Sequence, residues 1–325
     1  MTTSHPSFAV NVTLWRAMLA AMVAVCGCTC RGPVKPDEPP AKPETTLVPQ
    51  GVFTDDTDTV RGLSDLARDA DGQLWAIPER QDFLLRATFG VGTVQWVPYT
   101  VQGKPADTDG EALTWLAPGK FAIGTERHVD QRATDLLLIG HLHDQTAIID
   151  QQVALPYSLW GMLAADNKGI EGVCAAAGAI LAGVETVIDA GGRRYAPLGR
   201  YTIASGTWSA LRLQLTSTTG KISALSCAAQ PDGAVQLWAI ERHYGIARWL
   251  RATIAAGATG DIVARVHADL AVPTHAALTT VPNFEGMAAD GSDPTAVWLI
   301  ADNDSGGLKS GPNLIVKLGA AVPHR

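Results

Sequence analysis

Residues 111–126 read EALTWLAPGKFAIGTE and contain the pattern from which the architecture follows. Two short apolar runs flank Pro118-Gly119, a dipeptide that is typical of tight turns. A glutamate stands at each end of the unit, at Glu111 and at Glu126. The pattern predicts an antiparallel β-hairpin that places these two glutamates side by side at one end.

The same pattern occurs five times along the chain. The copies begin at Ser64, Glu111, Glu171, Ser223 and Glu285, and they end at Glu79, Glu126, Glu185, Glu241 and Asp302. The midpoint of every copy falls on turn-forming residues, namely Asp71-Gly72, Pro118-Gly119, Gly178, Asp232-Gly233 and Asp293-Pro294. Equivalent hairpins that recur in this way predict a repeat architecture.

Further apolar segments follow each hairpin, so each repeat can supply four strands. The segments are 83–89 and 93–100, 135–139 and 146–153, 200–204 and 210–215, and 246–253 and 261–266. The last repeat has only 313–318, so we expect residues 45–53 to supply its outer strand and close a ring.

The prediction is an all-β chain, a β-propeller of four-stranded blades with five blades. Six blades are the alternative if the segment 128–166 contains a divergent one. A two-sheet sandwich of similar length is the other alternative, but it does not require five equivalent hairpins.

Composition limits the function classes. The chain has 325 residues, of which 46% are hydrophobic and 18% charged, which is enough for a large core and excludes a chain that is disordered throughout. The formal net charge is −7 and no basic block stands out, so a nucleic-acid partner is not expected.

The first 27 residues are typical of an export signal. They carry one charged side chain, Arg16, followed by the apolar run 17–25, which is shorter than the roughly 20 residues that span a bilayer. The run ends in Cys26-Gly27-Cys28 and resembles a bacterial lipoprotein signal, with Cys28 as the lipidated residue because a small residue precedes it. An ordinary signal peptide with incidental cysteines is the alternative.

These features predict three regions: a signal peptide over 1–27, a proline-rich tether over 28–49 and the propeller domain over 50–325. We expect the protein in the cell envelope, facing the periplasm or the outside, with membrane contact through the lipid anchor only. Export permits a disulfide between Cys174 and Cys227, but their spacing does not distinguish a bridge from two thiols.

The inner strands of a propeller line its central channel, so the ends of the five hairpins should gather at one mouth. Carboxylates there can act in acid–base catalysis or hold a hard divalent cation, calcium above all, whereas cations can hold an anionic group. No organic cofactor is expected. The catalytic candidates are Glu111, Glu126, His128, Glu171 and Glu285; the substrate-binding candidates are Arg80, Arg127, Lys168, Arg242 and His243; the metal-binding candidates are Glu111, Glu171, Glu285, Asp302 and Asp304. Mutual neutralisation of these charges in a structural network is the alternative.

The segments 62–67, 168–173 and 283–287, together with 240–242 and 299–304, resemble the family called esterase-like activity of phytase. The resemblance extends over roughly 50–320 and implies a β-propeller in an exported bacterial protein that hydrolyses phosphate esters or other esters. Propellers of the SdiA-regulated type share the Glu-Gly signature. Ser64 and Ser223 stand where the other repeats have glutamate, which argues against a cluster made entirely of carboxylates.

Two functions follow as hypotheses. One is metal-assisted hydrolysis of a phosphate ester or other ester, with a small anionic or ester substrate. The other is a non-catalytic propeller that recognises a ligand or an envelope protein at the mouth.

Overall fold

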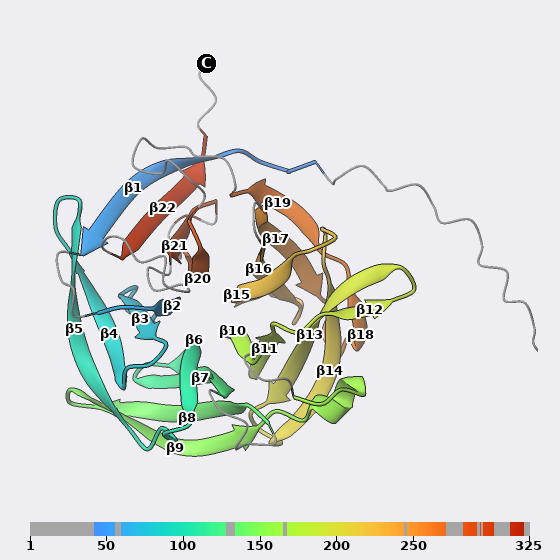
Figure 1. The fold of residues 1–325 in the computed structure, drawn as a ribbon, viewed down its shortest axis with the longest axis horizontal. Helices are drawn as coiled ribbons and strands as arrows, with labels where there is room; N and C mark the ends of the chain where they lie inside the picture. The colour runs from blue at the N-terminus through green and yellow to red at the C-terminus, as the bar shows by residue number, and fades with distance from the viewer. Residues whose placement is uncertain are drawn as a thin grey trace, which may run out of the picture. The chain divides into compact units, whose positions relative to one another are not determined.

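The structure is a computed structural model that describes residues 42–55, 60–127, 134–164, 168–243, 246–270, 282–290, 293, 295–301 and 313–321. All of these residues belong to one compact unit, Pro40–Arg325. Within that unit four-stranded antiparallel groups succeed one another around a centre in chain order (Figure 1). No helix in the described ranges is long and apolar enough to cross a membrane.

The first two groups consist of strands that are consecutive in the chain and pair as antiparallel neighbours. The first group contains β2 (Leu63–Arg68), β3 (Leu74–Pro78), β4 (Phe83–Phe89) and β5 (Thr93–Gln102). The second contains β6 (Thr108–Ala117), β7 (Lys120–Arg127), β8 (Leu136–His143) and β9 (Thr146–Ala154). Between residues 134 and 164 only a short 3-10 helix, η2 (Tyr157–Trp160), follows these strands, so the described part of 128–166 adds no further group.

The next two groups each carry a small irregularity. The third contains β10 (Ile170–Ala176), β11 (Ala179–Val184), β13 (Arg193–Thr202) and β14 (Thr207–Gln214), and the short β12 (Ile188–Ala190) pairs with β13. The fourth contains β15 (Lys221–Ala229), β16 (Val235–His243), β17 (Ile246–Ile254) and β19 (Arg265–Asp269).

The predicted single strand over 261–266 was wrong, because two strands occupy this stretch. β18 (Gly260–Ile262) pairs in parallel with β14 of the third group, whereas β19 pairs with β17 of the fourth. The break lies where Val263 is exposed. β18 thereby covers part of the outer edge of β14, which would otherwise leave backbone groups unpaired.

The fifth group closes the ring with the N-terminal strand. It contains β20 (Phe284–Ala289), β21 (Val297–Ala301), β22 (Leu314–Ala320) and β1 (Leu47–Asp55). β1 runs antiparallel to β22, which confirms that the segment before the first hairpin supplies the outer strand. β1 begins at Leu47, so the last three residues of the stretch 28–49, which we expected to be a tether, belong to a strand. The described residues form five groups, and a count of five blades for the whole chain stays a prediction.

The hairpin turns lie where the sequence places them. Gly72, Gly119, Gly178 and Gly233 connect the first two strands of their groups, and all four have positive φ angles of 78°, 69°, 75° and 81°. Residues other than glycine rarely adopt this backbone conformation, so these glycines determine where each hairpin reverses.

The core lies between neighbouring groups. Buried apolar side chains form five clusters, and each cluster is shared by two successive groups, including the fifth and the first. The inner strands β2, β6, β10, β15 and β20 also contact one another in a closed ring at the centre of Figure 1. Each group therefore buries its two faces against its neighbours, as in a β-propeller.

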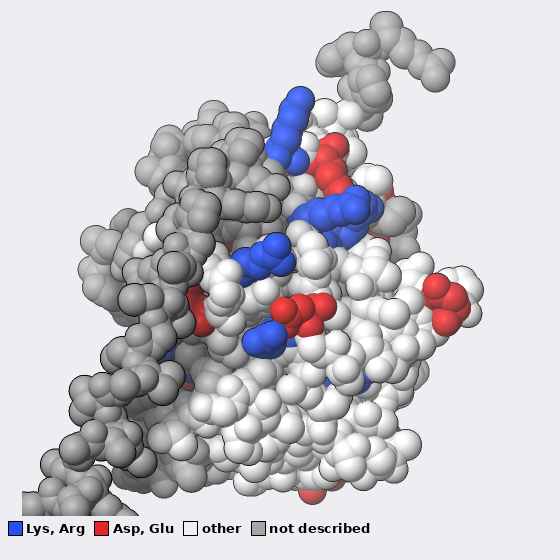
Figure 2. Space-filling view, turned by 90° about the vertical axis from the view of Figure 1, so that its right-hand side faces the viewer, with Lys and Arg blue, Asp and Glu red and all other residues white. Residues whose placement is uncertain are grey.

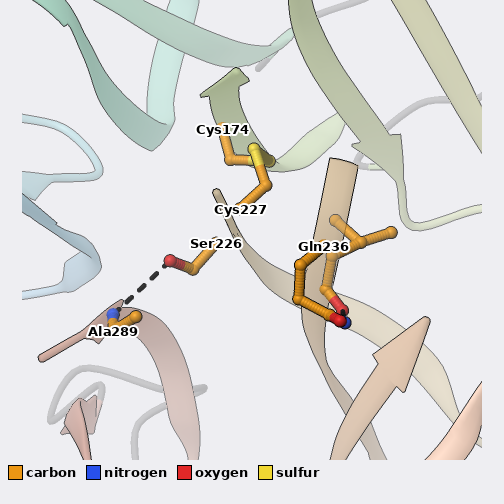
Figure 3. The surroundings of a disulfide bond; sticks show 6 residues. Cys174, Ser226, Cys227, Gln236 and Ala289 are labelled. Atoms are coloured by element: carbon orange, nitrogen blue, oxygen red, sulfur yellow. Dashed lines mark hydrogen bonds between the residues drawn. A yellow bond between two sulfur atoms is a disulfide. The ribbon is translucent and has the colours of Figure 1, made fainter. Parts of the chain in front are cut away.

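A disulfide crosses between two inner strands. Cys174 on β10 and Cys227 on β15 are bonded, with their Cα atoms 5.6 Å apart (Figure 3). Beside it, the Ala289 backbone N–H on β20 donates to the Ser226 hydroxyl at 3.4 Å. The bridge resolves the choice that the sequence left open and joins the third group covalently to the fourth.

The outer rim carries dispersed charge. On the face that carries β14 and β18, charged side chains are separated by neutral ones, and basic and acidic side chains lie next to each other (Figure 2). Arg212 on β14 donates to Asp261 on β18 at 2.7 Å. On the described part of this face positive charge is therefore partly balanced.

Candidate functional site

The first residue of every hairpin repeat lies in a β-bulge of its inner strand. The register with the second strand shifts by one residue at each of these positions, which are Ser64, Glu111, Glu171, Ser223 and Glu285. A bulge leaves the extra residue out of the ladder and redirects its side chain. We call the end of the inner strands that carries these residues the mouth.

Glu171 and Glu285 are each followed by a glycine, and the backbone of the adjacent inner strand leaves no room for a side chain there. A Cβ atom on Gly172 would lie 2.7 Å from the Leu225 nitrogen, and one on Gly286 would lie 2.4 Å from the Asp65 Cα. The inner strand of the adjacent group therefore approaches too closely for any side chain. The Glu-Gly pair thus has two roles, because the glutamate points away from the ladder and the glycine permits the ring of inner strands to close.

The bulge also changes which acids face each other. We expected Glu111 beside Glu126, but the pairing places Asp109 opposite Glu126 and leaves Glu111 unpaired in the ladder. Carboxylate oxygens of Glu79, Asp109 and Glu111 all lie within 4.8 Å of one another. The sequence pattern pointed to Glu111 but missed Asp109, because the spacing of hairpin ends does not show where a bulge falls.

The predicted acids Glu111, Glu126, Glu171 and Glu285 interact with one another at the mouth. Burial, followed by the carboxylates of Glu126 and Glu79, raises the pKa of Glu111 well above its ordinary value, and a hydrogen bond with Ser64 opposes this. Burial and then the charges of Glu111 and Glu126 raise the pKa of Glu171 likewise.

Glu126 connects the second group to the third. It accepts a hydrogen bond from the Gly169 backbone N–H at 2.9 Å, just before β10. Burial raises the pKa of Glu126, although this N–H favours its charged form. A carboxyl that is held in place and has a raised pKa is a candidate for proton transfer.

Cations contact one acid of the third group and one acid of the fifth. Lys168 contacts Glu185 at 3.0 Å, and Lys221 forms a second ion pair with the same carboxylate. Arg242 donates to both oxygens of Glu285. Burial, followed by the charge of Arg242, lowers the pKa of Lys221.

Asn283 completes the contacts around Glu285. Its Nδ2 donates to Glu285 Oε1 and its Oδ1 accepts from Arg242 Nη1, both at 2.6 Å. The structure therefore places the predicted cations Lys168 and Arg242 at the mouth and adds Lys221, which the sequence analysis did not select.

Two repeat residues have structural partners instead of facing the mouth. Glu241 is fully buried and accepts hydrogen bonds from the backbone N–H groups and hydroxyls of Thr216 and Ser217, which lie in the connection to β15. The Ser223 hydroxyl donates to the Phe284 carbonyl of the fifth group at 3.0 Å.

The remaining predicted residues divide into described and undescribed ones. Arg80 is exposed and contacts Glu79 at 2.9 Å and Asp109 at 3.8 Å, and His243 ends β16 opposite Ile246. Cys28, the Arg127 side chain, His128, Asp302 and Asp304 lie outside the described residues.

The acids of the first two groups suit a hard cation. Glu79, Asp109 and Glu111 offer oxygen ligands of the kind that calcium prefers. Glu111 belongs both to this cluster and to the predicted calcium set, whereas Glu285 of that set is held by Arg242. The full set with Glu171, Asp302 and Asp304 stays a prediction.

Comparison with known proteins identifies the family. A family model described as phytase-like, esterase-like activity of phytase, matches residues 58–305. The chain belongs to this family. The match confirms the resemblance seen in the short motifs, and the search of curated proteins finds no match.

Several solved structures are similar to this phytase-like chain, and the first of them supports its fold. A protein of unknown function from Dyadobacter fermentans DSM 18053 matches with a TM-score of 0.50 at 10% identity, covering 85% of this chain and 99% of that one. PQQ-bound aldose sugar dehydrogenase from Streptomyces coelicolor matches with a TM-score of 0.48 at 12% identity over 86% and 100%. The GH93 α-L-arabinofuranosidase of Fusarium graminearum, in complex with arabinobiose, matches with a TM-score of 0.49 at 8% identity over 84% and 98%.

Proposed function

We propose that this phytase-like propeller hydrolyses a phosphate ester or another ester at its mouth, assisted by a divalent cation such as calcium. The observation that carries the proposal is the juxtaposition of an acidic cluster with basic side chains. Glu79, Asp109 and Glu111 gather on one side, and Lys221 and Arg242 lie near the Glu171 carboxylate on the other. Ester hydrolysis needs both a group that activates water and groups that hold an anion.

Each set of residues has a defined role in this proposal. Glu79, Asp109 and Glu111 would hold the cation, which when bound polarises an ester oxygen and lowers the pKa of water. Glu171 and Glu126, whose pKa values are raised, would hold and release a proton. Lys168, Lys221 and Arg242 would attract the negative group of the substrate, with Arg127, His128 and His243 as further candidates.

A non-catalytic binding propeller is the second candidate, and a specific observation favours it. Glu185 and Glu285 are in ion pairs, and Glu241 is held by four hydrogen bonds. An acid that is fully engaged in such contacts stabilises the fold without taking part in chemistry. A mouth of this kind could recognise a small anion or an envelope protein by complementarity alone.

An assay of the full chain distinguishes the two candidates. We would measure release of phosphate and of p-nitrophenol from a panel of esters with calcium, magnesium, zinc or EDTA. If the protein is a hydrolase, we expect metal-dependent turnover that falls about 100-fold in Glu111→Gln. Loss of one acid–base or ligand group typically has an effect of this size.

The matched control is Asp71→Asn, an acid-to-amide change in the exposed turn at the opposite end of the first group. It should leave turnover unchanged. If the folded protein shows no turnover under any condition, the binding propeller is the better description. If Glu111→Gln retains full turnover, the acidic cluster at the mouth is not the active site and this proposal is overturned.

The proposed site of action is the cell envelope, with Cys28 as the lipid-anchored residue. Cys28→Ser should release the protein from the membrane fraction and remove the acyl mass from the mature N-terminus. Retention of that mass in Cys28→Ser, measured by mass spectrometry, would contradict Cys28 as the lipid-anchored residue.

A further inference from the structure

A cavity lies at the end of the propeller opposite the mouth. It has a volume of about 300 Å³, and its lining includes Arg68, Gln73, Phe89, Asp290, Trp298 and Lys317. These residues come from the β2–β3 turn region, the end of β4, and β21 and β22 with the residue after β20. The cavity therefore lies between the first and fifth groups, where the ring closes, and it shares no residue with the acidic cluster at the mouth.

A buried carboxylate fixes two cations in this cavity. Asp290 is only 5% exposed, and its Oδ1 contacts Arg68 Nη1 at 2.8 Å while its Oδ2 contacts Lys317 Nζ at 2.7 Å. Two positive charges thus face one carboxylate in this triad, and Asp293 also interacts with Lys317 and Asp290. Arg68 and Lys317 can attract a negatively charged group of a ligand.

The Arg68 guanidinium is held before any ligand arrives. Its Nε and Nη2 donate to the Gly72 carbonyl at 3.2 and 3.1 Å. A Cβ atom on Gly72 would lie 2.9 Å from Arg68 Nη2, so the glycine leaves room for the guanidinium.

The cations retain donors for a ligand. Three of the five guanidinium N–H groups of Arg68 meet acceptors among the described residues, which leaves two. The Lys317 ammonium has three donors, and Asp290 accepts one of them.

Aromatic rings form the wall beside these cations. The ring centroids of Phe89 and Trp298 lie 5.1 Å apart with their planes tilted by 39°, and the Phe53 ring on β1 lies 4.8 Å from Phe89 and 5.7 Å from Trp298. Lys317 Nζ lies 5.4 Å from the centre of the Trp298 ring. Aromatic rings thus stand next to positive charge, and the ring of a ligand packs favourably against such rings.

We propose that this cavity binds a small aromatic monocarboxylate. Its carboxylate accepts hydrogen bonds from Arg68 and Lys317, and its ring packs against Trp298 and Phe89. The volume of about 300 Å³ lies at the lower end of the range of roughly 300–1,000 Å³ for small-molecule pockets, which suits a ligand with one ring and one carboxylate. The site is separate from the proposed hydrolysis and does not depend on it.

The test titrates the full chain with benzoate and follows binding by calorimetry and ligand-observed NMR. Acetate supplies the charge without the ring, and benzamide supplies the ring without the charge. We expect saturable benzoate binding that is at least tenfold tighter than binding of either comparison compound. Absence of saturable benzoate binding, or equal binding of benzamide, would overturn the proposal.

Variants locate the binding. Lys317→Gln should weaken benzoate binding at least tenfold, and it leaves Asp290 in contact with Arg68, so folding should persist. Lys120→Gln makes the same charge change at an exposed position in the neighbouring group and should have no effect. If Lys317→Gln does not fold, Phe89→Leu, at an exposed position of the wall, should give a similar loss. Unchanged affinity in a folded Lys317→Gln or Phe89→Leu protein would place benzoate elsewhere and overturn the proposal.

Discussion

Glu111 in the second group and Glu285 in the fifth occupy the same bulge position, yet their surroundings differ. Burial and then neighbouring carboxylates raise the pKa of Glu111. In contrast, Arg242 donates to both carboxylate oxygens of Glu285, and Asn283 donates to one of them. The repeat therefore determines where the acid lies, and residues from adjacent strands and connections determine its chemistry. We call the first two groups, which carry Glu79, Asp109, Glu111 and Glu126, the reactive side of the mouth. We call the last three groups the supporting side, because they carry most of its ion pairs, although they also contribute Glu171 and the substrate-binding cations to the proposed site.

The groups of the supporting side are also linked to one another by more covalent and ionic contacts than the groups of the reactive side, among the described residues. The disulfide links the third and fourth groups, Glu185 links Lys168 with Lys221, and Arg242 links the fourth group with the fifth. If this contrast is correct, substitutions on the supporting side should reduce stability, whereas substitutions on the reactive side should mainly change activity and pH dependence.

The largest expected effect is the loss of the disulfide. Replacing Cys174 and Cys227 together by serine should lower the free energy of unfolding by about 4 kcal/mol, because the bridge closes a loop with a sequence separation of 53 residues. Urea unfolding of the oxidised protein and of the double variant measures the difference.

Dithiothreitol provides the control for this experiment. It should destabilise the wild type by a similar amount and leave the double variant unchanged. A loss below about 1 kcal/mol would show that the supporting side does not depend on its bridge.

A smaller effect is expected from Arg242→Met. The Arg242 and Glu285 side chains are 17% and 13% exposed, so the substitution leaves a largely buried carboxylate without its cation. We expect a loss of about 3 kcal/mol in the free energy of unfolding, measured in urea.

Arg80→Met is the matched control on the reactive side. Arg80 also contacts acids, but its side chain is 60% exposed, so its removal should change the free energy of unfolding by less than about 0.5 kcal/mol. Equal losses for the two variants would remove the distinction between the two sides of the mouth.

The hairpins and ring closure could be predicted because they depend on local chemistry. Turn glycines, alternating apolar runs and the missing strand of the last repeat are all visible along the chain, and β1 beside β22 confirms the inference. The split at Val263 could not be predicted, because β18 pairs with a strand of another group.

The site was predicted less completely for the same physical reason. Repeat positions indicated Glu111, Glu171 and Glu285, but a bulge is a property of the paired strands, so Asp109 was missed. Arg242 and Glu285 are 43 residues apart in the sequence and come from adjacent groups. Arg68 and Asp290 are 222 residues apart and also come from adjacent groups. Contacts of this kind depend on tertiary packing, which single-sequence spacing does not encode.

The smallest expected effect is on the pH dependence of the free energy of unfolding. Its sign distinguishes an acid with a raised pKa, Glu111, from an acid with a lowered pKa, Glu44. The raised pKa of Glu111 means that the folded state binds its proton more tightly than the unfolded state, where glutamate titrates near 4.3. Its contribution to stability is complete below that pH and is lost as pH rises through the folded pKa. Glu111→Gln should therefore gain stability relative to the wild type between pH 4 and pH 8, measured by urea unfolding in EDTA.

Glu44→Gln should show the opposite slope, because a hydrogen bond with His267 and the charge of Arg251 lower the pKa of Glu44. The contribution of Glu44 is present above the unfolded pKa and is lost as pH falls through the folded pKa, so the variant should be less stable than the wild type at pH 7 and should approach it near pH 3. The difference should be a few tenths of a kcal/mol, since the pair is solvent-screened. Parallel slopes in the two variants would mean that the mouth does not hold Glu111 in its protonated form, and the proton-holding role of the reactive side would have to be abandoned.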